Sequence, residues 1–94
     1  MTSVVITQSK PESASFYELT EEFNQYVDEN YINTGKLTVT KTLNGNNEVE
    51  TVLSFASNAD RIAYINDPVI LAQRVAEHAH NKNLAISSNS EVSQ

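Results

Sequence analysis

Residues 37–56, LTVTKTLNGNNEVETVLSFA, predict two β-strands joined by a turn, and this hairpin decides the fold class. Residues 37–43 alternate, with threonine at every even position, and residues 48–56 follow an Asn-Gly turn signal as the returning strand. A two-residue loop would pair Val39 with Glu50. A loop of three or five residues instead places the apolar residues of both strands on one face. We therefore predict a longer or bulged loop centred on residues 45–47.

The segment before the hairpin predicts a long amphipathic helix. Ser15 and Glu18 have the spacing of a capping box, in which the two side chains satisfy free backbone N–H groups at a helix start. Apolar residues then recur at three- and four-residue steps and form one face of a helix. We expect this helix to end near Asn33, with Gly35 as its left-handed cap.

The segment after the hairpin predicts a second helical region with a break. Ser57 or Asn58 caps a short helix over residues 58–65, and a second helix begins with Asp67 as cap and Pro68 at its first position. One kinked helix is the alternative. A single apolar stripe runs through both parts and predicts the second wall of a core; it comprises Ile62, Ile65, Val69, Ala72, Ala76 and Ala79.

The order of elements is β-α-β-β-α-(β), with a first strand over residues 3–8 and a short last strand over residues 84–86. It predicts an α+β fold in which two helices pack on one face of a small antiparallel sheet, as in ferredoxin-like domains. We expect one domain over residues 1–86 and a flexible tail over residues 87–94. The other sheet face would be polar and would join two copies in a homodimer; its residues are Thr38, Thr40, Thr42, Glu50, Val52 and Ser54.

Charge and composition exclude several classes of function. The 94 residues carry a net charge of −6, and the six lysines and arginines are scattered along the chain. Direct nucleic-acid binding and binding to anionic membranes are therefore not expected, whereas a basic protein partner is compatible with the charge. The sequence has no cysteine, no recognisable signal peptide and no apolar run that would span a membrane. We expect a soluble, cytoplasmic protein.

No catalytic or metal-binding motif is present. The two histidines, His78 and His80, would lie about 200° apart on a helix, so they cannot bind one metal ion together. Glu77 and His80 have the Glu-x-x-His spacing of carboxylate metal sites, but such sites need further ligands on facing helices. We expect no metal, no cofactor and no catalytic residue.

Acidic residues of the first helical segment form the most prominent charged surface. The first interpretation of the function is a non-enzymatic accessory or protein-interaction domain, such as a phage or bacterial regulator. Its candidate partner-binding residues are Glu18, Glu21, Glu22, Glu29, Tyr17 and Tyr31.

Residues 53–68, LSFASNADRIAYINDP, support an alternative. A strand containing Phe55 ends, a serine cap opens a helix, and Asp-Pro follows about ten residues later. This passage resembles the third strand and second helix of antibiotic-biosynthesis-monooxygenase-like domains. The resemblance implies a dimeric α+β sandwich or barrel that binds or transforms a small molecule. The resemblance carries over no functional residues; in this alternative, we expect the pocket to lie between sheet and helices, near Tyr26, Phe55, Tyr64 and His78.

Overall fold

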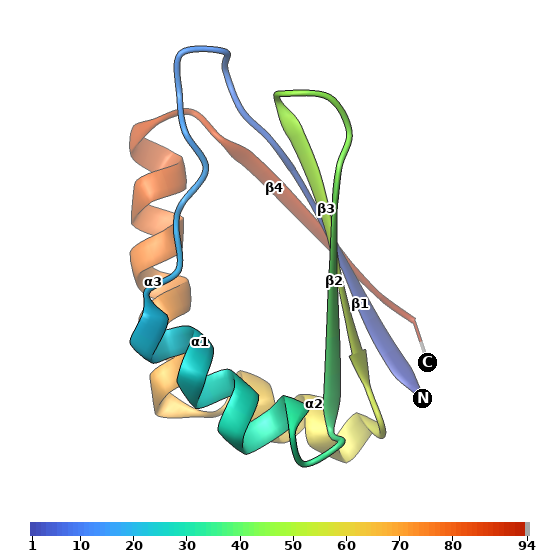
Figure 1. Cartoon of the computed structure of the whole chain (residues 1–94). Coiled ribbons are helices and arrows are strands. Elements are labelled where there is room, and N and C mark those ends of the chain that lie inside the picture. Colours follow the sequence, from blue (N-terminus) through green and yellow to red (C-terminus); the bar gives the residue numbers. More distant parts are fainter. Residues whose placement is uncertain (94) are drawn as a thin grey trace.

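The computed structural model describes residues 1–93, which form one four-stranded antiparallel sheet with helices on one of its faces (Figure 1). The strands lie in the order β2-β3-β1-β4. This is the predicted α+β, ferredoxin-like arrangement. In chain order the elements are β1 Thr2–Ser9, α1 Glu21–Val27, the π-helical segment η1 Asp28–Ile32, β2 Leu37–Leu43, β3 Glu48–Phe55, α2 Asn58–Ile65, α3 Pro68–Asn83 and β4 Ser87–Ser93.

The hairpin of β2 and β3 has the predicted register. Leu43 pairs with Val49 across the turn, and Leu37 pairs with Phe55 at the other end. Five residues therefore separate the last pair, and the odd number keeps the apolar residues of both strands on the face that the helices cover. The backbone N–H of Asn44 donates to the carbonyl oxygen of Glu48 at 2.9 Å and closes the loop.

The predicted break between two helices is also confirmed. The Ser57 hydroxyl accepts from the backbone N–H of Asp60 at 3.1 Å and caps α2. Asp67 caps α3 through its bond from the backbone N–H of Val69 at 2.9 Å, and Pro68 is the first helical residue. Proline fits there because its missing N–H would have no partner in the first turn.

The first helix begins later than predicted. The capping box at Ser15 does not form; Thr20 is the cap instead, with its hydroxyl accepting from the backbone N–H of Phe23 at 3.1 Å. The reason lies in a tertiary contact, because the Ser15 carbonyl oxygen accepts a 2.8 Å hydrogen bond from the His80 ring on α3. The helix then widens into η1, where the N–H of Asn33 donates to the carbonyl of Asp28 at 2.8 Å.

The predicted end of the chain is wrong in two respects. Residues 84–86 are not a strand, because Ala85 adopts a left-handed conformation with φ 56° and turns the backbone after α3. Residues 87–93, expected to be part of a flexible tail, form β4 and pair with β1 from Ser87 opposite Ser9 to Ser93 opposite Ser3. Gln94 lies outside the described residues. Serine and asparagine concealed this strand, since both are common in loops.

The apolar core lies at one end of the sheet, where α1, η1 and the start of α3 meet β2 and β3. Phe55 and Ile70 are each 1% exposed. They pack in one buried cluster with Val27, Tyr31 and Leu37. The hydroxyls of Tyr26 and Tyr31 both donate to Oδ2 of Asp67 at 2.6 Å, which ties the first helical segment to the cap of α3.

Two left-handed positions predict changes in stability of opposite sign. Gly35 has φ +77° and open space around it, so Gly35→Ala should cost about 1 to 2 kcal/mol through backbone strain alone. Ala85→Gly should relieve a similar strain and raise the free energy of unfolding by about 1 kcal/mol. Urea unfolding of both variants and of the parent chain measures the two effects. Equal signs for the two variants would contradict the backbone explanation.

The sheet face opposite the helices carries the polar residues that the sequence placed there, including Thr40 paired with Val52. Self-association through this face stays a prediction. Light scattering on a sizing column checks it, and the expected result is twice the mass of one chain at both low and high salt. Among the described residues, no helix is long and apolar enough to cross a membrane.

Candidate functional site

The side of α3 that faces the sheet is polar along most of its length. After Ile70, the half-buried or buried positions at three- and four-residue steps are Gln73, Glu77 and Asn81. The small and apolar residues expected to face the core are exposed instead: Val69, Ala72, Ala76 and Ala79. The expectation that this helix is a core wall is therefore wrong. The break at Asp67-Pro68 resets the helical phase, so one stripe cannot run through both helices.

A large open cavity lies between this helix and the sheet. Its volume is about 1010 Å³, which is at the upper end of the usual range for small-molecule sites. The sheet contributes apolar side chains, mainly Val4, Ile6, Val39, Leu43, Val49 and Leu53. Leu43 is 71% exposed although it faces the helix layer, because no side chain of that layer covers it.

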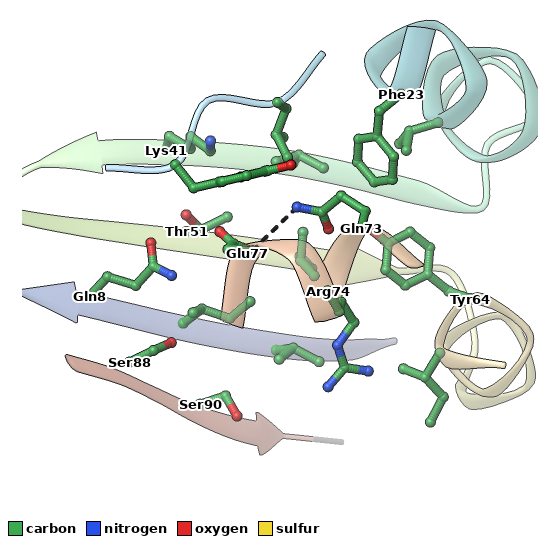
Figure 2. Close-up of a pocket in the computed structure, with 18 of the residues that line it drawn as sticks. Gln8, Phe23, Lys41, Thr51, Tyr64, Gln73, Arg74, Glu77, Ser88 and Ser90 are labelled. Carbon is green, nitrogen blue, oxygen red and sulfur yellow. Dashed lines mark hydrogen bonds between the residues drawn. The ribbon is translucent and has the colours of Figure 1, made fainter. Parts of the chain in front are cut away.

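Polar side chains enter the cavity from both layers (Figure 2). Thr51 and Gln8 project from β3 and β1, and Ser88 and Ser90 project from β4. From α3, Gln73 and Glu77 are joined by a hydrogen bond of 3.4 Å between Nε2 and Oε2. The cavity lining is therefore apolar over much of the sheet and mixed along α3 and β4, where polar side chains lie beside Leu71, Val75 and Val92.

The irregular segment of residues 10–19 runs beside α3 (Figure 1), and Phe16, Tyr17 and Leu19 also line the cavity. The Tyr17 ring meets the His80 ring edge to face, with the centroids 5.4 Å apart. At its start, the Lys10 ammonium donates to the Asn47 side chain at 3.1 Å and lies 5.7 Å from the Phe16 ring centre. These contacts hold the segment against both layers, so the cavity has a side wall there.

Of the four residues expected to form a pocket, Phe55, Tyr64 and His78 line the cavity. Tyr26 does not, because its hydroxyl binds Asp67 on the other side of the core. The Tyr64 ring packs edge to face on Phe55 and Tyr31, at centroid distances of 5.3 and 5.0 Å. Burial raises the pKa of Tyr64, so its hydroxyl stays protonated at neutral pH and can donate a hydrogen bond.

The residues expected to bind a protein partner do not share one surface. Tyr31 is only 7% exposed and belongs to the core, which corrects its assignment as a contact residue. Tyr17 is half-buried against His80. The four glutamates Glu18, Glu21, Glu22 and Glu29 are exposed. Glu21 and Glu22 lie in the first turn of α1, where negative charge stabilises the helix dipole.

Several polar cavity residues were not identified from sequence: Gln73, Arg74, Glu77 and Asn81. The three- and four-residue spacing of these residues could have predicted a polar helix face. The pattern is visible only when α3 is analysed separately from α2, because the break between the two helices changes which residues share a face. Within residues 1–93, no three histidine, cysteine or acidic side chains come together as a group that could hold a metal ion.

The chain is a small α+β domain with an open cavity between its sheet and its helices. No family model and no curated protein matches the chain. A solved structure from Deinococcus radiodurans, described as a candidate antibiotic biosynthesis monooxygenase, is similar over 100% of this chain and 91% of its own, with 10% identity and a TM-score of 0.54. At this identity, the similarity shows the shared fold.

This comparison contradicts the first interpretation of the function, a non-enzymatic interaction domain. The fold is shared with a protein whose description names chemistry on a small molecule, as the alternative interpretation expected. The first interpretation, with the acidic residues as its leading functional surface, is therefore wrong.

Proposed function

We propose that this protein binds a small organic molecule in the cavity between α3 and the inner face of the sheet. The observation that carries the proposal is the inverted polarity of α3: its half-buried or buried polar residues Gln73, Glu77 and Asn81 line a cavity of about 1010 Å³, whereas Val69, Ala72, Ala76 and Ala79 are exposed and lie outside the lining. A helix that only covers a sheet would turn its apolar side inward. Val69, for example, is 41% exposed and does not line the cavity.

The composition of the walls supports a ligand of mixed polarity. Small-molecule sites combine a mostly apolar lining with a few placed polar groups, and this cavity has both. The description of the Deinococcus protein as a candidate monooxygenase adds support for an organic ligand of this kind. Burial of apolar surface would supply most of the affinity, and the polar groups would orient the ligand.

The neutral fluorescent dye N-phenyl-1-naphthylamine tests the proposal, since it brightens when it leaves water. Thr51 faces the cavity from the middle of β3, and Thr40 faces away from it on β2. We expect the parent chain and Thr40→Trp to bind the dye, and Thr51→Trp to bind it less tightly because the indole occupies part of the cavity. Circular dichroism checks that both variants fold. Equal binding by the two variants would place the dye elsewhere and contradict the proposal.

A further inference from the structure

We propose that the ligand is an organic anion whose acidic group is held by Arg74 of α3 together with Ser88 and Ser90 of β4. This inference rests on the proposed function and specifies the chemistry of its ligand. The body of the ligand would lie on the apolar inner face of the sheet, and its carboxylate, sulfonate or similar head group would lie between α3 and β4.

The charge of the cavity differs from that of the whole chain. The protein has twelve acidic and six basic residues. Three of the basic residues line the cavity, namely Lys41, Arg61 and Arg74, whereas only two acidic residues do, Asp28 and Glu77. The cavity lining is thus net positive by one charge within a chain of net charge −6. Such a contrast favours a negatively charged ligand over a positively charged one.

Arg74 is the cavity cation best placed to meet a ligand. Its side chain leaves α3 toward β1 and β4 (Figure 2). Within residues 1–93, no carboxylate lies within 4.0 Å of its guanidinium. Arg61, by comparison, is occupied locally, because its Nε donates to the Asn58 side chain at 2.9 Å. A guanidinium offers five N–H donors in a planar fork that matches a carboxylate or a similar oxyanion.

The strand facing Arg74 supplies further donors. Ser88 and Ser90 point inward from β4, since they pair with Gln8 and Ile6 of β1 on the cavity side. Serine hydroxyls can donate hydrogen bonds to anions. If β4 only covered a core, apolar residues would be expected at these two inward positions. These two serines and Arg74 line the same cavity, and Figure 2 shows the Arg74 side chain directed toward β4; we refer to this region as the polar corner.

Asn81 provides an independent sign that this side of the cavity lacks a partner. It lies two turns after Arg74, it is only 7% exposed, and its Oδ1 is the one buried side-chain polar atom without a hydrogen-bond partner among the described residues. A buried polar atom left unpaired costs about 1 to 3 kcal/mol, so native proteins seldom keep one without use. Rotation of this amide would offer a ligand either a donor or an acceptor.

Glu77 is the cavity-lining acidic residue nearest in sequence to Arg74, and its position limits the repulsion of an anion. Its Oε2 accepts from Gln73, on the side of α3 away from β4. Asp28 belongs to η1, which contacts β2, and β2 is the edge strand opposite β4. An anion beside β4 therefore meets the positive charge of Arg74 before either carboxylate.

Two dyes that differ by one acidic group test the inference. 8-Anilinonaphthalene-1-sulfonate carries a sulfonate, and N-phenyl-1-naphthylamine is the same molecule without it. We expect Arg74→Gln to raise the dissociation constant of the sulfonate dye about tenfold and to leave that of the neutral dye unchanged. Lys36→Gln is the matched control, because it removes one positive charge from an exposed loop that does not line the cavity.

Each result has a distinct meaning. Loss of the sulfonate dye alone, in Arg74→Gln alone, supports the anion site. An equal loss of both dyes in Arg74→Gln means that the residue only shapes the cavity, which overturns the inference and leaves the proposed function intact. An equal effect of Lys36→Gln on the sulfonate dye overturns the inference in favour of general charge attraction. Failure of the parent chain to bind either dye contradicts the proposed function itself.

Discussion

The Phe55→Ala variant is expected to lose about 3 to 5 kcal/mol of its free energy of unfolding. Phe55 is 1% exposed, belongs to the only large buried cluster among the described residues, and supports the Tyr64 ring at 5.3 Å. A domain of this size has about 5 to 15 kcal/mol in total. Because the cavity replaces part of the core, few other contacts can compensate, and we expect the variant to be largely unfolded at 37 °C.

Phe16→Ala is the matched control, since it removes the same ring from a half-buried position that lines only the cavity. We expect it to cost about 1 kcal/mol. Urea unfolding followed by circular dichroism measures both variants. An equal cost at the two positions would show that the packing centre does not lie at Phe55.

The second large effect is expected at Asp67. Asp67→Ala removes the cap of α3 and leaves the hydroxyls of Tyr26 and Tyr31 without an acceptor, so we expect a loss of about 3 kcal/mol. Asp67→Asn should cost less, because the single amide oxygen can replace either Oδ1, which accepts from Val69, or Oδ2, which accepts from the two tyrosines, although it cannot replace both. Asp60→Ala, in the first turn of α2, is the control, and its expected change is within about 0.5 kcal/mol.

The same cluster predicts how stability depends on pH. Burial acts to raise the pKa of Asp67, but hydrogen bonds from Tyr26, Tyr31 and the backbone N–H groups of Val69 and Ile70 together lower it below its ordinary value of 3.8. The stability from this group is therefore fully present above pH 3.8 and is lost as the pH falls through the lowered, folded-state pKa.

At alkaline pH the sign reverses. Burial and the hydrogen bond to Asp67 raise the pKa of Tyr31 above its ordinary value of 10.0. The unfolded chain then loses this proton first, so stability declines as the pH rises above 10. Urea unfolding of the parent chain and of Asp67→Asn, at pH values from below 3.8 to above 10, measures both the acid and the alkaline decline in stability. The substitution should reduce the pH dependence on both sides of the plateau, and an unchanged curve would contradict the assignment.

The sequence predicted most of the fold because local signals and tertiary structure agree there. The hairpin register followed from alternation and the need to keep Leu37, Val49 and Phe55 on one face. The break at Asp67-Pro68 followed from the chemistry of a cap and of proline. Where a distant contact competes with a local signal, the prediction was wrong: the His80 ring binds the Ser15 carbonyl, and Ser15 does not open the helix.

The cavity was harder to predict. Phe55, Tyr64 and His78 were expected in a pocket between sheet and helices and do line the cavity, but the side of α3 that faces the sheet was predicted incorrectly. Its outward face is apolar enough to resemble a core stripe, and hydrophobic periodicity alone cannot tell which side of such a helix faces the sheet. The polar β4 was missed because its pairing with β1 joins residues that lie 78 (Ser9 with Ser87) to 90 (Ser3 with Ser93) positions apart in the sequence.

That separation has a kinetic consequence for the site. The hairpin of β2 and β3 closes a loop of a few residues, whereas the pairing of β1 with β4 closes a loop of nearly the whole chain and loses more conformational entropy. Contacts of this kind tend to form late in folding. The strand that bears Ser88 and Ser90 would thus dock last, and a ligand held there binds only the fully assembled sheet. Such a ligand slows the undocking of β4, and hydrogen exchange at residues 87–93 would report its occupancy.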